Sequence, residues 1–150
     1  MQVLVDTSVW SLALRRPPRL AVNAVVDATS TVAADATQQA AVSALRDLIV
    51  DGRACLLGAV RQELLSGIKS ARQFGTLREA LKGFEDVALV QSDHELAAEF
   101  FNTCRSKGVR GSNTDFLICA AASARQLPIL TTDQDFALYG KHLPIDLLRF

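Results

Sequence analysis

Four acidic residues far apart in the chain form the candidate site. They are Asp6, Glu63, Asp115 and Asp133. If these carboxylates meet, they repel one another strongly and cannot all stay ionised unless a cation lies among them. Oxygen ligands with no accompanying histidine or cysteine favour Mg²⁺, or Mn²⁺ in its place, over zinc. The four acids therefore predict a site for a hard divalent cation.

The chemistry expected of such a site is hydrolysis of a phosphodiester bond. Mg²⁺ keeps several of its waters and binds through one or two carboxylates together with substrate phosphate. It positions and activates a water for in-line attack, and a second ion recruited with the substrate would stabilise the leaving oxygen. Nearby hydroxyls are expected to orient the carboxylates or the waters. The candidate hydroxyls are those of Thr7, Ser8, Thr114 and Thr132, and Ser8 is favoured because it lies closest to Asp6.

The elements around these acids alternate between strand and helix. Short apolar runs predict strands at 2–5, 55–57, 87–90 and 128–130, with an edge strand at 146–150. Helical spacing predicts helices at about 41–50, 60–68, 71–84, 92–107 and 113–125. Ser92 and Glu95 form an expected capping box, and Ser112 or Asn113 is expected to cap the last helix. This alternation predicts an α/β fold with parallel strands and right-handed crossovers.

This order of elements brings the acids to one edge of the sheet, because ligands of open α/β sheets bind at the carboxyl ends of the strands. Asp6 ends the first strand and Asp133 follows the fourth. Glu63 and Asp115 are expected in the first turns of their helices. For residues 21–39, a helix, a flap and a mobile insertion all remain open.

Composition limits the remaining possibilities. Hydrophobic residues make up 49% of the 150 residues and charged residues 21%, which is typical of one globular domain. No apolar stretch is long enough to span a membrane, and we expect a cytoplasmic protein. The three cysteines are predicted to be buried and unpaired, and His94 and His142 to take surface or cap positions. The formal net charge is zero. Basic clusters that could contact phosphate are Arg15, Arg16 and Arg19; Lys69 and Arg72; and Arg105, Lys107 and Arg110.

The segments around the acids resemble the successive motifs of PIN-domain ribonucleases, in particular the VapC-type toxins. These segments are Val5-Asp6-Thr7-Ser8-Val9-Trp10, Glu63-Leu64-Leu65-Ser66-Gly67, Thr114-Asp115-Phe116-Leu117-Ile118 and Leu130-Thr131-Thr132-Asp133-Gln134-Asp135-Phe136. The resemblance covers nearly the whole chain and is specific because four motifs occur in order. Residues 21–39 look longer than the corresponding part of the family.

The resemblance implies one PIN domain over residues 1–150, folded as a three-layer α/β/α sandwich around a mostly parallel sheet of four to five strands. It implies a Mg²⁺-dependent endoribonuclease, with Mn²⁺ as a substitute, that acts as the toxin of a toxin-antitoxin pair. Asp6, Glu63, Asp115 and Asp133 take the acidic positions, with Asp6 and Asp115 as direct metal ligands and Asp135 as an auxiliary residue. The implied partners are an RNA substrate, a second copy of the chain and an antitoxin that covers the site.

Two other functions stay open. A phosphatase could use Asp6 as its nucleophile, but the haloacid-dehalogenase-like pattern requires a second aspartate where this chain has Ser8. A non-catalytic PIN-like module that binds RNA or protein would be expected to have lost at least one of the acids, and none is missing. Mn²⁺-dependent cleavage of RNA separates these alternatives.

Overall fold

The centre of the fold is a small parallel sheet, seen in a computed structural model that describes residues 1–15 and 28–150. Its strands are β1 (Val3–Val5), β2 (Ala54–Cys55) and β3 (Ile129–Leu130), in the order β2-β1-β3. β1 pairs with both neighbours in parallel, and its three residues are fully buried. Such continuous burial is typical of a strand covered on both faces.

The sheet has fewer full strands than the four to five expected from the sequence. The predicted strands at 87–90 and 146–150 are replaced by single parallel bridges, Leu56 with Asp86 and Ile129 with Leu147. Beyond the first bridge, the carbonyl of Ala88 accepts a hydrogen bond from Arg125 Nη2 at 2.9 Å. Pairing does not continue beyond this bridge, because the chain enters a helix at Gly58, two residues after Leu56. The predicted α/β class and parallel pairing are confirmed, and only the strand count changes.

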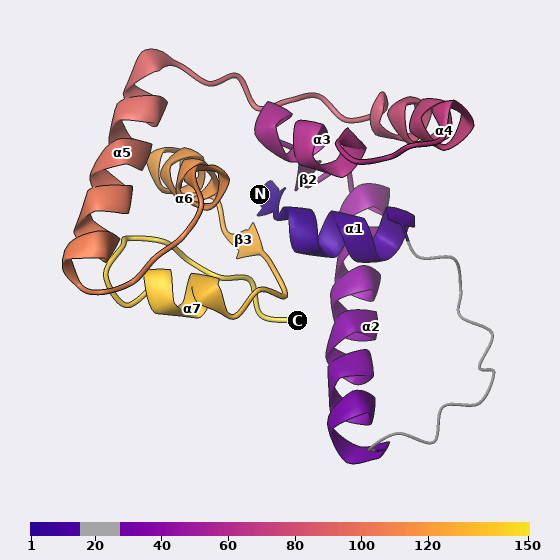
Figure 1. The fold of residues 1–150 in the computed structure, drawn as a ribbon, viewed down its shortest axis with the longest axis horizontal. Helices are drawn as coiled ribbons and strands as arrows, with labels where there is room; N and C mark the ends of the chain where they lie inside the picture. Colours follow the sequence, from indigo (N-terminus) through magenta and orange to yellow (C-terminus); the bar gives the residue numbers. More distant parts are fainter. Residues whose placement is uncertain (16–27) are drawn as a thin grey trace.

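Helices cover both faces of the sheet, which confirms the three-layer architecture (Figure 1). One group consists of α1 (Thr7–Arg15), α2 (Ala28–Val50), α3 (Gly58–Leu65) and α4 (Ala71–Leu81). The other group consists of α5 (Gln91–Ser106) and α6 (Asn113–Arg125), with the short α7 (Asp135–Tyr139) beside them. The sheet lies between the two groups.

Two helices that position acids were not predicted from the sequence. α1 begins directly after Asp6, whose carbonyl accepts from the amides of Val9 and Trp10 at 3.2 and 3.4 Å. Val9 and Trp10 are fully buried and fix the helix against the core. α7 has only five residues, too few for a clear helical period, and it is fixed by the burial of Phe136 and Tyr139.

Several predicted boundaries shift. α2 begins at Ala28, so residues 28–39 of the open segment are helical, while residues 21–27 lie outside the described part of the chain. α3 and α4 end at Leu65 and Leu81, earlier than expected.

Ser92 is not the cap of α5, as had been expected. The helix begins at Gln91, and Asp93 Oδ2 accepts from the amide of Val90 at 2.9 Å. The amide of Asp93 in turn donates to the carbonyl of Val90 at 3.0 Å. Asp93 therefore takes the position in the first turn that had been given to Glu95.

The core is continuous across both helical layers. Its largest fully buried side chains include Trp10, Phe116, Phe136 and Tyr139. Cys55, Cys104 and Cys119 are buried and unpaired, and His94 and His142 are exposed, as predicted. Among the described residues, no helix is both long and apolar enough to cross a membrane.

Candidate active site

Asp6 lies between β1 and α1 and has only 4% of its surface exposed. Its Oδ2 accepts from Ser8 Oγ at 2.7 Å and from Thr131 Oγ1 at 2.8 Å. The expected contact between Ser8 and Asp6 is therefore present, and a second hydroxyl from the end of β3 joins it. Burial raises the pKa of Asp6 above the ordinary value, although the hydrogen bonds oppose this change.

Asp115 lies in the first turn of α6, as predicted, because Ser112 caps the helix by accepting from the Asp115 amide at 3.1 Å. Its Oδ2 accepts from the hydroxyl of Tyr139 at 2.7 Å. Burial raises the pKa of Asp115, and the negative charges of Asp6 and Asp133 raise it further. Asp6 and Asp133 are therefore each within electrostatic reach of Asp115.

Asp133 lies in the loop between β3 and α7, again as predicted. Its amide donates to Thr131 Oγ1 at 3.0 Å, and its Oδ1 accepts from the amide of Asp135 at 2.9 Å. Thr131 therefore links the backbone of Asp133 to the carboxylate of Asp6. Asp135 is exposed and begins α7, so its backbone rather than its side chain holds Asp133.

Glu63 differs from its expected position. α3 begins at Gly58, so Glu63 falls in the second turn and not the first, and its side chain is exposed. Its Oε2 accepts from Thr7 Oγ1 at 2.7 Å. Because Thr7 follows Asp6 directly, this bond places Glu63 beside the acid cluster and joins α3 to the start of α1.

Two residues of this network were not identified from the sequence. The hydroxyl of Thr131 takes the role that was predicted for the neighbouring Thr132. Thr132 contributes its amide, which donates to Ser8 Oγ at 3.1 Å. Tyr139 is the single tyrosine of the chain, and its buried hydroxyl requires a partner. The need of a buried tyrosine for a hydrogen-bond partner could have pointed to this contact. Burial and the hydrogen bond to Asp115 both raise the pKa of Tyr139, so the hydroxyl stays protonated and donates.

The carboxylate oxygens of this site fit a hydrated cation held by two carboxylates better than a cation enclosed by protein ligands alone. Within the described residues, no group of three or more acids, histidines or cysteines is arranged to hold one metal ion. The hydroxyls of Ser8 and Thr131 donate to Oδ2 of Asp6, and the hydroxyl of Tyr139 donates to Oδ2 of Asp115. In the same part of the chain, no lysine or arginine forms an ion pair with Asp6, Asp115 or Asp133. Mg²⁺ bound through one or two carboxylates and several waters matches this set.

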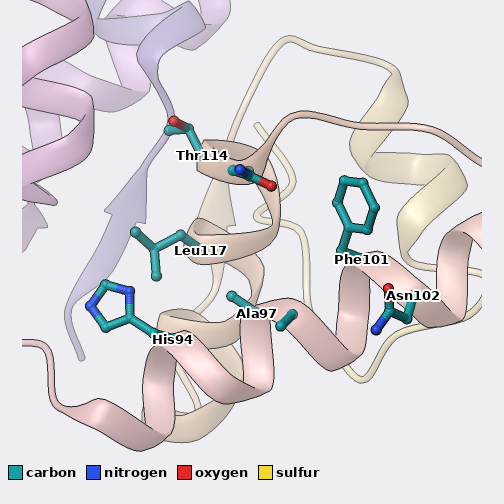
Figure 2. Close-up of a pocket in the computed structure, with 8 residues that line it drawn as sticks. His94, Ala97, Phe101, Asn102, Thr114 and Leu117 are labelled. Atoms are coloured by element: carbon teal, nitrogen blue, oxygen red, sulfur yellow. The ribbon is translucent and has the colours of Figure 1, made fainter.

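A pocket of about 400 Å³ lies between α5 and the start of α6 (Figure 2). Thr114, predicted as an auxiliary residue, lines this pocket together with Asn113 and Leu117 of α6. Across from them, His94, Ala97, Phe101 and Asn102 come from α5. Thr114 immediately precedes Asp115 in the chain, but none of the four acids lines the pocket.

The basic clusters lie on different surfaces. Lys69 and Arg72 are exposed and line a hollow of about 1040 Å³, which Leu14 of α1 also lines. Arg105 and Arg110 line a smaller hollow of about 250 Å³, and Lys107 is exposed near them. The side chains of Arg15, Arg16 and Arg19 lie outside the described residues.

Comparison with known proteins places this geometry in a family. A search of curated proteins gave no significant match. Among solved structures, the crystal structure of FitAcB from Neisseria gonorrhoeae is similar, with a TM-score of 0.68 and 17% identity over 99% of this chain and 97% of that chain. This similarity shows a shared fold. The family model of the PIN domain matches residues 3–141. The chain therefore belongs to the PIN-domain family.

Proposed function

We propose that this chain is a Mg²⁺-dependent endoribonuclease that also accepts Mn²⁺ and acts as the toxin of a toxin-antitoxin pair. PIN domains are generally nucleases, and PIN nucleases generally use divalent metals. One observation carries the proposal for this chain. Asp6 and Asp115 come from different elements, lie within electrostatic reach, and have no ion-pair partner among the described lysines and arginines.

We assign Asp6 and Asp115 to binding the cation through the oxygens that Ser8, Thr131 and Tyr139 do not occupy. When bound, the cation supplies a polarised water and neutralises charge on the phosphate. Asp133 and Glu63 flank these two residues, held by the Asp135 amide and the Thr7 hydroxyl respectively. We assign them to ordering water around the scissile phosphate.

The two alternatives have less support. A nucleophilic Asp6 would have to attack substrate from a side chain that is 4% exposed and bonded to two hydroxyls. Ser8, which occupies the place of the second acid of a phosphatase, donates to Asp6 instead of protonating a leaving group. A non-catalytic binding module gives no reason for several unneutralised carboxylates to gather at one edge, because such repulsion lowers stability.

The test is Asp115→Asn compared with the wild type in Mn²⁺-dependent cleavage of a mixed-sequence RNA. We expect the variant to lose cleavage and to remain folded, because removing one carboxylate from a repelling cluster does not lower the stability of the metal-free protein and can raise it. Cleavage by the variant at the wild-type rate would refute the site. A wild type that hydrolyses a phosphomonoester but not RNA would favour the phosphatase.

We propose two protein partners: a second copy of this chain, and an antitoxin that lays apolar side chains on the toxin and reaches a basic residue into the acidic site. Light scattering at micromolar concentration tests the homodimer, and a monomer there would contradict it without affecting the enzyme. Co-purification with the product of the adjacent reading frame, together with inhibition of RNA cleavage by that product, tests the antitoxin.

A further inference from the structure

Tyr139 is fully buried, so its polar hydroxyl needs a hydrogen-bond partner inside the protein. Tyr139 has no exposed surface, and its ring packs against Phe116 at 4.9 Å and Phe136 at 5.2 Å between centroids. An unbonded hydroxyl at such a place would destabilise the fold. The hydroxyl donates to Asp115 Oδ2 at 2.7 Å, so the core of α6 and α7 directs a donor onto one oxygen of one acid.

Gly111 provides the space for this contact. A β-carbon at position 111 would overlap the Tyr139 hydroxyl and would lie 2.7 Å from Cζ of the same ring and 3.0 Å from Phe116 Cε2. Separations this short require a neighbour to move. Gly111 precedes Ser112, the cap of the helix that carries Asp115. The chain therefore has its smallest residue where the tyrosine hydroxyl approaches the backbone.

We infer that Tyr139 is a positioning residue for the cation site, whose hydroxyl holds Oδ2 of Asp115 and thereby directs Oδ1 to the ion, with Gly111 making room for that hydroxyl. This inference rests on the proposed metal-dependent activity. A similar arrangement is present at Asp6, where the hydroxyls of Ser8 and Thr131 both donate to Oδ2. Partners that orient a metal ligand typically change metal affinity or activity by about 10–100-fold when removed.

The test compares Tyr139→Phe, Gly111→Ala and the double variant, with Gly140→Ala as the matched control. Tyr139→Phe keeps the ring and removes only the oxygen. A β-carbon at position 140 would meet its nearest atom, the carbonyl oxygen of Phe136, at 3.4 Å, so the control changes a neighbouring glycine without displacing the hydroxyl. Binding is measured as free Mn²⁺ by electron paramagnetic resonance, and cleavage of RNA is measured across a Mn²⁺ series. Circular dichroism melts check folding.

We expect Tyr139→Phe to weaken Mn²⁺ binding about tenfold or more and to recover most of its cleavage rate at saturating Mn²⁺. Gly111→Ala should weaken binding at least as much, because its β-carbon displaces the hydroxyl and also meets Tyr139 Cζ at 2.7 Å and Phe116 Cε2 at 3.0 Å. The double variant keeps these two ring contacts and should bind no better than Gly111→Ala. Gly140→Ala should bind like the wild type. Unchanged Mn²⁺ affinity in Tyr139→Phe would overturn the inference.

The same experiment separates this inference from the proposed function. A wild type that binds Mn²⁺ but leaves RNA intact would overturn the proposed function. The order of Mn²⁺ affinities among the variants would still decide the role of Tyr139.

Discussion

The guanidinium of Arg125 binds both carboxylate oxygens of Asp93, with 2.8 Å from Nη1 to Oδ1 and 2.8 Å from Nη2 to Oδ2. Asp93 is 3% exposed and also accepts from the amide of Val90. The ion pair joins the first turn of α5 to the last residue of α6. Since Asp115 lies at the other end of α6, this pair fixes the helix that carries one of the candidate metal ligands.

Acid should weaken this link in a defined range of pH. The Arg125 hydrogen bond lowers the pKa of Asp93 to about 2, from an ordinary value of 3.8. A carboxyl group with a lowered pKa stabilises the fold above its unfolded pKa and loses that contribution as pH falls towards its folded pKa. Chemical denaturation should therefore show stability falling between about pH 4 and about pH 2.

Asp93→Ala should reduce the free energy of unfolding at neutral pH by about 3 kcal/mol, because it leaves Arg125 without its partner. The variant should also lose most of the decline between about pH 4 and about pH 2. Glu79→Gln is the control, since it breaks the exposed ion pair with Lys82 and should change stability little. An equal acid response in wild type and Asp93→Ala would show that other groups cause it.

The sequence predicted features that depend on neighbouring residues and missed those that depend on distant ones. The cap at Ser112 and the place of Asp115 follow from residues within one helical turn, and both are confirmed. The predicted start of α5 was wrong, because Asp93 in its first turn is held by Arg125, 32 residues away. The bond from Thr7 to Glu63 spans 56 residues and that from Tyr139 to Asp115 spans 24, so spacing alone gave no sign of either.

Strand ends show the same limit. Asp6 could be placed because it directly follows a fully buried apolar run, and Asp133 because it follows another after two threonines. The outer strands at 87–90 and 146–150 were overestimated, because an apolar run does not show how long the neighbouring strand is, and β2 and β3 have only two residues each.

Removing either of the hydroxyls that donate to Asp6 should weaken metal binding. Ser8→Ala removes a 2.7 Å donor and also the acceptor of the Thr132 amide, while Thr131→Val removes a 2.8 Å donor. Each change should raise the Mn²⁺ concentration needed for half-maximal cleavage about tenfold. The two losses should not be additive, because both hydroxyls bind one oxygen and lie 3.3 Å apart.

The matched control for these two variants is Ser43→Ala on the exposed face of α2, which should cleave like the wild type. Ser8→Ala and Thr131→Val variants with unchanged Mn²⁺ dependence would show that Asp6 does not need these donors.

Cys119 should resist alkylation as long as the protein is folded. It is fully buried one turn after Asp115, and burial raises its pKa, followed by the negative charge of Asp115. Because the thiolate is the reactive form, iodoacetamide at about pH 8 should label Cys119 only after unfolding. Asp115→Asn should stay protected, since burial is the larger cause. Mass spectrometry of the labelled peptide measures this, and rapid labelling of native protein would contradict the buried position.

Divalent metal should stabilise the folded protein. Asp6 and Asp115 have raised pKa values because they are buried, and the charges of Asp6 and Asp133 add repulsion at Asp115, so a cation that binds only the folded state relieves an unfavourable arrangement. At a concentration of about 100 times the dissociation constant, the gain is about 2.7 kcal/mol, which for a domain of this size raises Tm by several degrees. Differential scanning calorimetry with Mn²⁺, Mg²⁺ or chelator measures this shift. The Asp6→Asn, Asp115→Asn double variant should melt at one temperature in all three conditions, because it lacks both proposed ligands. Zinc should have no advantage, since no histidine or cysteine completes a metal-binding group among the described residues. A wild-type Tm that does not change in millimolar Mn²⁺ would mean that Asp6 and Asp115 do not share an ion, and the proposed nuclease site would lose its physical basis.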